Sequence, residues 1–257
     1  MESLPPELSP TGYLAEVRRV LEHIEKTQTD AVVAAGALIA DSIAAEGVLQ
    51  AFGTGHSEAL AMEVSGRAGG FVPSNKLALR DLILFGGEPV DLLNDPKVER
   101  REGLAKRIYE LAPVEPQDVF VIASNSGGNG VIVEMAEHVT SLGHKLIAIT
   151  SLDHTSRITS RHSSGKVLKD FADVVLDNGA PYGDAVLPLP SFGANVCGIS
   201  SVGNAVLAQM VIAEAVRLLA ERGVEAPMYL SANATGSDAH NDALEARYAG
   251  RIRRSAS

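Results

Sequence analysis

The chain has 257 residues, of which 46% are hydrophobic and 21% are charged, and its formal net charge is −10. This length suits one large domain or two small ones, and the apolar content is ample for a buried core. An acidic chain without a basic stripe or base-stacking aromatic residues is expected to bind neither nucleic acid nor an anionic membrane. A single cysteine, Cys197, cannot form an internal disulfide, and no signal peptide is recognisable. We therefore expect a cytoplasmic protein.

The N-terminal part of the chain is predicted to be a polar tail followed by helices. Apolar residues recur at helical spacing from Thr11 to about Glu46, and Thr29 or Asp30 is a suitable N-cap for a second helix. We expect a tail and helical arm over 1–29, one main domain over 30–225, and a C-terminal tail over 226–257.

The main domain alternates short apolar runs with helical patterns. Strands are predicted at 48–52, 71–72, 119–123, 146–150 and 172–176. Helices are predicted at 57–67, from a cap at Asp95 to 111, at 130–142 and at 199–222, whereas 73–96 and the Pro- and Gly-rich stretch 179–193 show no clear element. This alternation predicts an α/β fold: a doubly wound, flavodoxin-like parallel sheet of about five strands with helices on both faces.

Two polar glycine loops follow apolar strands and precede helices. The first glycine loop is Gly-Thr-Gly-His-Ser (53–57), and the second glycine loop is Ser-Asn-Ser-Gly-Gly-Asn-Gly (124–130). Glycines let backbone N–H groups approach an anion, serine hydroxyls add donors, and the following helix offers its positive dipole end. Each loop is therefore suited to hold a phosphate group.

The motif residues that are missing from the two loops narrow the choice of ligand. Glu58 occupies the position of the third small residue in a dinucleotide fingerprint, and no acidic residue stands about 20 residues on to bind a ribose. Neither loop ends in the Gly-Lys-Ser/Thr of a P-loop. NAD and ATP are therefore disfavoured, and we expect a phosphomonoester bound without a cofactor.

With these two loops in this order, the chain resembles the SIS (sugar isomerase) phosphosugar-binding domains. Members carry a G-x-G-x-S loop, then an S-x-S-G loop, then an apolar strand ending in Thr, which here is Lys-Leu-Ile-Ala-Ile-Thr (145–150). The resemblance covers roughly 30–223. It implies that Ser57, Ser124, Ser126 and Asn129 face the sugar phosphate. The neighbouring loop residues Asn125 and Thr54 are further candidates for phosphate and substrate binding.

The acid–base group is sought on the helix after the first loop. In related phosphosugar isomerases and in N-acetylmuramic acid 6-phosphate etherase this helix carries a catalytic glutamate. Counted from Ser57, the position that matches the etherase residue is Arg67, so Glu63 is a candidate by location only. An ordinary solvated carboxylate is the alternative. His56, inside the first loop, is the rival, since it could transfer a proton or neutralise phosphate.

A polar, basic stretch at 160–166 contains two further candidates. Arg161 and His162 could clamp phosphate or sugar hydroxyls, although a solvated basic loop is the alternative. Asp153-His154 and the 238–242 stretch each contain metal-ligand residue types, but neither has a third ligand at a recognisable spacing. We expect no metal site.

A phosphate anchor and a base suit proton abstraction next to the carbonyl of an opened sugar. The resemblance to the etherase branch favours a lyase or dehydratase acting on an N-acetylhexosamine 6-phosphate such as N-acetylglucosamine 6-phosphate. A phosphoheptose isomerase-like aldose–ketose isomerase is the alternative, and a non-catalytic sugar-phosphate sensor is the third hypothesis. The apolar N-terminal arm and the long apolar helix also favour a homodimer or homotetramer, with a purely internal packing role as the alternative.

Overall fold

The computed structural model describes residues 7–253, and a parallel sheet lies at its centre. Five strands are hydrogen-bonded in the order β2-β1-β3-β4-β5. They are β1 (Leu49–Gly53), β2 (Ser74–Leu77), β3 (Val119–Ala123), β4 (Lys145–Thr150) and β5 (Val174–Asp177). All four pairings within this sheet are parallel. The predicted α/β fold with a five-stranded parallel sheet is therefore confirmed.

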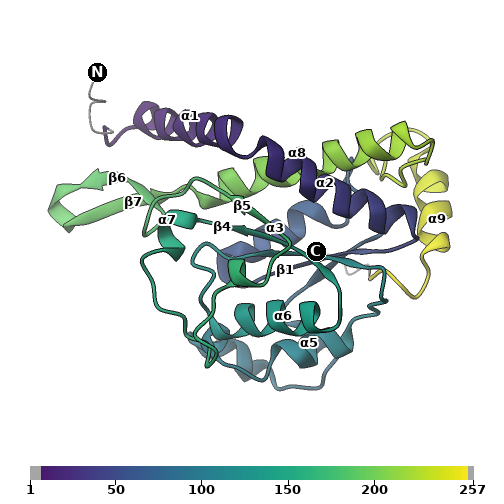
Figure 1. The fold of residues 1–257 in the computed structure, drawn as a ribbon, viewed down its shortest axis with the longest axis horizontal. Coiled ribbons are helices and arrows are strands. Elements are labelled where there is room, and N and C mark those ends of the chain that lie inside the picture. Colours follow the sequence, from purple (N-terminus) through teal and green to yellow (C-terminus); the bar gives the residue numbers. More distant parts are fainter. Residues whose placement is uncertain (1–6, 254–257) are drawn as a thin grey trace.

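Helices cover both faces of the sheet (Figure 1). One face carries α1 (Pro10–Thr27), α2 (Thr29–Ala44), α3 (Glu58–Val64) and α8 (Ser200–Glu221), and the other carries α5 (Ala105–Leu111) and α6 (Gly130–Ser141). The remaining helices are the short α4 (Asp81–Leu84) and α7 (Leu152–Thr155), and α9 (Ser237–Arg247) near the C-terminus. A two-stranded hairpin, β6 (Ala185–Leu189) and β7 (Ala194–Gly198), projects from the body beside α1 (Figure 1).

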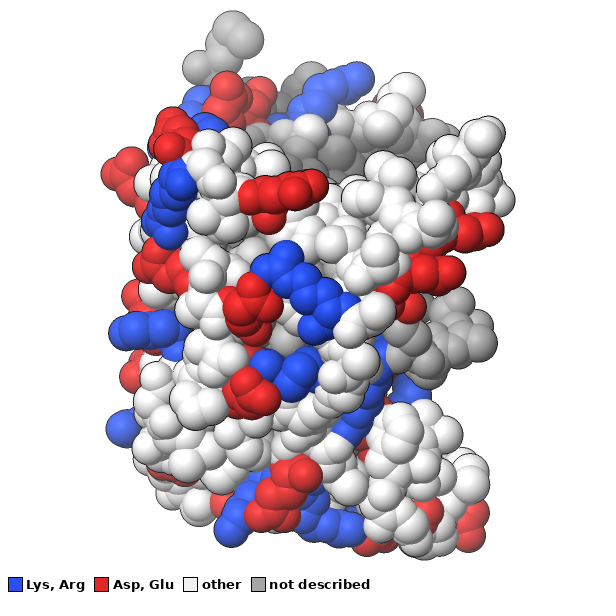
Figure 2. Space-filling model, turned by 90° about the vertical axis from the view of Figure 1, so that its right-hand side faces the viewer, with Lys and Arg blue, Asp and Glu red and all other residues white. Residues whose placement is uncertain are grey.

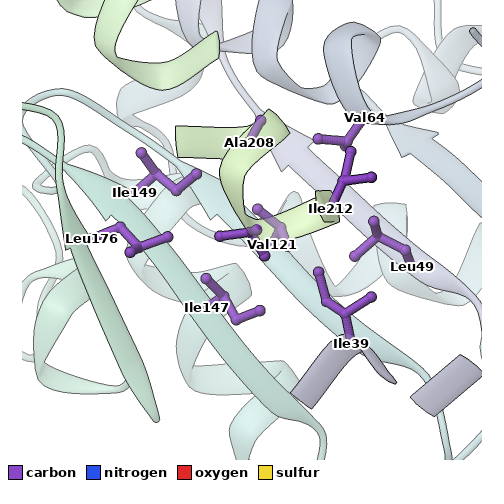
Figure 3. Close-up of a pocket in the computed structure, with 10 residues that line it drawn as sticks. Ile39, Leu49, Val64, Val121, Ile147, Ile149, Leu176, Ala208 and Ile212 are labelled. Carbon is purple, nitrogen blue, oxygen red and sulfur yellow. The ribbon is translucent and has the colours of Figure 1, made fainter. Parts of the chain in front are cut away.

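The strands are apolar throughout because both of their faces are buried. Every residue of β1 and β3 is buried, and their side chains divide between two separate cores. Figure 3 shows the core under α2 and α8, where aliphatic side chains surround a gap of about 10 Å³. A gap of that size without polar partners does not bind a water molecule, so we interpret it as a packing gap in the core.

The long helix α8 is apolar for the same reason. By length and composition alone it could cross a membrane. It packs instead along α2 and α3, and its buried residues include Leu207, Val211 and Leu219. Its hydrophobicity is thus accounted for by the core.

Three predicted elements differ from the structure. Phe71 and Val72 are not in the sheet: Phe71 bridges Met228 of the C-terminal segment, and the edge strand is β2 three residues later. The helix predicted from Asp95 begins only at Ala105, because a 3₁₀ turn (Val98–Arg100) and Gly103 at positive φ intervene. The 179–193 stretch, predicted as irregular, includes β6 and the turn of the hairpin, and β7 follows it directly.

A buried ion pair anchors the C-terminal segment to the amino edge of the sheet. The fully buried Asp118 accepts hydrogen bonds from the Val48 amide (2.9 Å) and the Gln50 side chain (2.8 Å). Arg251 pairs with Asp118 at 2.7 Å and with Glu115 at 2.6 Å. Elsewhere on the face that carries α9, Figure 2 shows acidic and basic side chains interspersed, without a stripe of one sign.

We expect Asp118→Ala to lower the free energy of unfolding by about 3–5 kcal/mol, because it removes the buried partner of Arg251 and leaves three further donors, in Val48, Gln50 and Glu115, without their acceptor. Asp41→Ala, which breaks the exposed ion pair with Arg222, is the matched control and should cost less than about 1 kcal/mol. Urea denaturation of both variants measures this. Equal losses would contradict the anchoring role.

Candidate functional site

The two glycine loops lie together at the carboxyl edge of the sheet. β1 pairs with β2 on one side and β3 on the other, and the last residues of β1 and β3, Gly53 and Ala123, are register partners. The strand order therefore reverses between these two strands, and ligands of doubly wound sheets bind in the crevice at such a switch point. Both loops open onto it.

The first glycine loop is a 3₁₀ turn (Gly55–Ser57) that leads into α3. Gly55 has a φ of 55°, which favours glycine, and a Cβ at Gly53 would stand 2.4 Å from the Ser57 carbonyl oxygen. The Thr54 hydroxyl donates to the Glu99 carboxylate at 2.9 Å. His56 is exposed and Ser57 is half-buried.

The second glycine loop is held in shape by its own serines and by threonines behind it. The Ser124 hydroxyl accepts from the Gly127 amide at 3.1 Å, which fits the φ of 66° at Gly127. The Thr150 hydroxyl at the end of β4 donates to the Ser124 carbonyl oxygen at 2.7 Å, and Thr155 donates to that of Ser126 at 3.0 Å. The strand-terminal Thr therefore positions the loop and lies behind it.

Arg161 contacts the second glycine loop directly. The Arg161 guanidinium donates to the Asn129 side-chain oxygen at 2.7 Å, and the Arg161 amide donates to the Gly128 carbonyl oxygen at 2.8 Å. Asn129 is the N-cap residue of α6, but its side chain does not cap the helix. The first turn of α6 thus presents amide donors and a positive dipole end beside an arginine, which suits an anion.

His56 and Glu63 line one pocket on the other side of the first loop. Asn204 and Ser201 of α8 complete its polar lining, with Ala59, Leu60 and Ala205. Glu63 forms an ion pair with Arg67, and its carboxylate also accepts from the Gln209 side chain at 2.7 Å. Two candidate acid–base groups and the first turns of α8 therefore line the same pocket.

Buried asparagines connect this pocket to the second glycine loop. The Asn178 side-chain amide donates to Asn204 at 2.9 Å and to Asn125 at 3.1 Å. Asn178 is fully buried, and its hydrogen bond to Asn204 is shielded from water. This bridge fixes the orientation of Asn204 in the pocket relative to Asn125 in the loop.

His154 stands next to Asn125, and sequence reasoning considered it only as a metal ligand. Its Nδ1 lies 3.4 Å from the Asn125 side-chain nitrogen and accepts from the Gly183 amide at 3.3 Å. Burial lowers the pKa of His154, although the carboxylates of Asp184 and Asp153 act in the opposite direction. The ring is therefore neutral at pH 7, with Nδ1 as an acceptor.

His162 is used within its own loop. Its ring is buried, its Nδ1 lies 2.8 Å from the Ser164 hydroxyl, and its Nε2 lies 3.6 Å from the Glu102 carboxylate. Arg161, in contrast, is exposed and reaches the second glycine loop. Of the two predicted clamp residues, only Arg161 is seen to contact a glycine loop.

Within residues 7–253, no three His, Cys, Asp or Glu side chains form a group that could hold a metal ion. The sequence analysis missed Glu99, Asn178 and Asn204. Asn178 directly follows β5, so the rule that ligands lie at the carboxyl ends of strands could have marked it. Nothing comparable marks Glu99, which lies far from both loops in the sequence.

The fold and the loops define a class: a doubly wound α/β protein with two anion-binding loops at its switch point. A model of the SIS domain matches residues 12–151, more than half of the chain. The chain belongs to the SIS domain family. It is 42% identical to a UPF0309 protein of Listeria monocytogenes over 93% of this chain and 97% of that protein. A UPF0309 protein of Streptomyces coelicolor is 39% identical, covering 95% and 96%.

Solved structures agree on the fold. A phosphoheptose isomerase from Francisella tularensis superposes with a TM-score of 0.55 at 15% identity, covering 80% of this chain and 96% of that one. The phosphoheptose isomerase GmhA from Neisseria gonorrhoeae gives 0.52 at 17% identity, covering 82% and 96%. The predicted family and fold are therefore confirmed, while the roles of individual site residues stay predictions.

We expect Ser57→Ala and Ser126→Ala each to weaken binding of a sugar 6-phosphate by about 1–3 kcal/mol, the usual value of a hydrogen bond to a charged group. Ser141→Ala, at the far end of α6, is the matched control and should bind like wild type. Isothermal calorimetry measures all three. Unchanged affinity in both loop variants would rule out the phosphate anchor.

Proposed function

We propose that the protein is a phosphosugar lyase or dehydratase that acts on an N-acetylhexosamine 6-phosphate such as N-acetylglucosamine 6-phosphate. The observation that carries this proposal is the meeting of two glycine loops at the switch point, with Glu63 and His56 in a pocket beside them. Phosphate would bind at the start of α6, contacting Ser126, Asn129 and Arg161. The family membership supports a sugar phosphate as the ligand.

The reaction follows from the groups at hand. A base next to an opened sugar removes the C2 proton, which is acidic because the C1 carbonyl stabilises the carbanion. When C2 carries an acylated nitrogen, simple aldose–ketose isomerisation is blocked, so departure of the C3 hydroxyl as water is the open path. Glu63 is the proposed base, since it lines the pocket beside the first glycine loop. His56 is the rival.

An aldose–ketose isomerase is the second candidate. Two solved structures that share the fold with a TM-score above 0.5 are named phosphoheptose isomerases, and the same loops and base would serve that reaction. A sensor without catalysis is the third candidate, and it would need only the loops. Near-ultraviolet absorbance of a new conjugated double bond identifies the lyase, whereas a ketose without it identifies the isomerase.

We also propose a cytoplasmic homodimer or homotetramer. Leu14 and Leu21 of α1 are 49% and 38% exposed, and Phe192 at the tip of the β6–β7 hairpin is 68% exposed. These apolar side chains lie on the two elements that project from the body (Figure 1), which supports self-association there. We propose the domain boundaries that the sequence predicts: a tail and helical arm over 1–29, the main domain over 30–225 and a C-terminal tail over 226–257.

Glu63→Gln should lower turnover about 10²- to 10⁴-fold and leave substrate binding nearly intact, because the phosphate anchor is elsewhere. His56→Ala should impair both turnover and binding, since His56 belongs to the first glycine loop. Glu137→Gln, on the exposed side of α6, is the control and should retain activity. The measurement is steady-state kinetics with calorimetric binding. If Glu63→Gln turns over at the wild-type rate, Glu63 is not the base, and His56 takes that role.

Activity should survive dialysis against a strong chelator, because the proposed chemistry uses only side chains and backbone amides of the chain. The assay compares turnover before and after dialysis, with added zinc or magnesium as the control. Loss of activity that a divalent ion restores would contradict the proposal of a metal-free site.

A further inference from the structure

The pocket between α3 and α8 has a lining that is polar on one side and apolar on the other. Its volume is about 110 Å³, whereas a single water molecule needs about 10–15 Å³. Ala59, Leu60 and Ala205 form the apolar side, and Asn204 belongs to the polar side. The pocket therefore has room for a small substituent that is itself partly apolar and partly polar.

The backbone fixes the direction of the buried asparagine hydrogen bonds. The Ala180 amide, which can only donate, donates to the side-chain oxygen of Asn178 at 3.0 Å. The side-chain nitrogen of Asn178 is then the donor toward Asn204, and it lies 2.9 Å from the Asn204 side-chain oxygen. Asn204 is thereby oriented with its oxygen toward Asn178, which leaves its side-chain nitrogen to donate to another group.

The Asn204 side-chain nitrogen is a donor that lacks a protein acceptor. Only 5% of Asn204 is exposed, and among residues 7–253 the structure gives this nitrogen no acceptor. A buried donor without a partner is unfavourable, so such groups in folded proteins commonly bind an ordered water or a ligand. Because Asn204 lines the pocket, a hydrogen-bond acceptor placed in the pocket would satisfy it.

An acetamido group has the complementary chemistry. Its carbonyl oxygen accepts a hydrogen bond, which the Asn204 nitrogen can donate, and its methyl group suits the apolar side of the pocket. A free ammonium at the same carbon has no acceptor atom for Asn204. A hydroxyl could accept from Asn204 but would leave the apolar side unfilled.

The position of the pocket also agrees with that of the candidate bases. In an N-acetylhexosamine, the acetamido nitrogen and the acidic proton are both attached to C2. Glu63 and His56 line the same pocket as Asn204. An acetamido group held by Asn204 therefore brings C2 and its proton next to both candidate bases.

We propose that this pocket binds the acetamido group of the substrate and that Asn204 selects for it by donating to the acetyl carbonyl oxygen. This inference rests on the proposed function, in which a sugar 6-phosphate binds at the two glycine loops. Asn178 positions Asn204 and also donates to Asn125 of the second glycine loop at 3.1 Å. One buried side chain thus links the loop proposed to bind the phosphate with the residue proposed to bind the acetamido group.

Two reduced sugar phosphates that cannot react test the proposal by calorimetry. N-acetylglucosaminitol 6-phosphate and glucitol 6-phosphate are open-chain compounds without the C1 carbonyl, so their C2 proton is not acidic, and they differ only in the C2 substituent. We expect wild type to bind the acetylated compound at least about tenfold more tightly, because it adds one hydrogen bond and one buried methyl group.

Substitutions in α8 separate recognition of the acetamido group from binding of the phosphate. Asn204→Leu removes the donor, and Ala205→Leu fills the apolar side of the pocket. In each variant the preference should fall to about threefold or less, while the affinity for glucitol 6-phosphate should stay within about twofold of wild type. Ala220→Leu, the same change at an exposed position near the end of α8, should retain the full preference.

Equal affinity of wild type for the two compounds would overturn the inference, and so would a full preference in Asn204→Leu or a lost preference in Ala220→Leu. If Asn204→Leu and Ala205→Leu weaken both compounds equally, these residues support the whole site and do not select the substituent, which also overturns it.

The same measurements distinguish this inference from the proposed function. A preference in wild type without turnover of N-acetylglucosamine 6-phosphate would uphold the acetamido pocket and contradict the lyase, whereas turnover without a preference would do the reverse. Failure of wild type to bind either compound would contradict both proposals.

Discussion

The parallel pairing of β1 with β3 is the constraint on which the rest of this structure depends. Because Gly53 and Ala123 are register partners, the two glycine loops emerge side by side although about 70 residues separate them. Antiparallel pairing would place them at opposite edges of the sheet. The sheet thereby fixes the positions of both loops. Three other parts of the chain then contact the loops at the same crevice: the 95–104 segment, the buried asparagines and the basic stretch at 160–166.

Much of the fold could be predicted from the sequence because its strands are buried on both faces and therefore apolar throughout. The edge strand β2 was misplaced because its residues are Ser-Asn-Lys-Leu, of which only the last is apolar. One of its polar side chains is held by the C-terminal segment: Asn75 donates to the Arg251 carbonyl oxygen and accepts from the Arg253 amide. Such long-range partners are invisible in a local pattern.

Among the candidate site residues, those inside the glycine loops have the positions that follow most directly from the sequence. Thr54, His56, Ser57, Ser124, Asn125, Ser126 and Asn129 follow strands directly, so their positions at the carboxyl edge follow from the fold. Glu99 reaches the same edge from the 95–104 segment, whose sequence has no hydrophobic periodicity. It lies in a 3₁₀ turn that interrupts the helix predicted from Asp95 to 111. The position of such a residue depends on tertiary contacts to Thr54 and Gly130, which no spacing rule encodes.

The central claim is that one sugar phosphate occupies both glycine loops at the switch point, and backbone-amide NMR during a titration with N-acetylglucosamine 6-phosphate tests it most directly. The account predicts that amides of the first and second glycine loops shift together, with one dissociation constant, while those of α9 stay unchanged. Shifts confined to one loop, or to the groove between α1 and the β6–β7 hairpin, would contradict it.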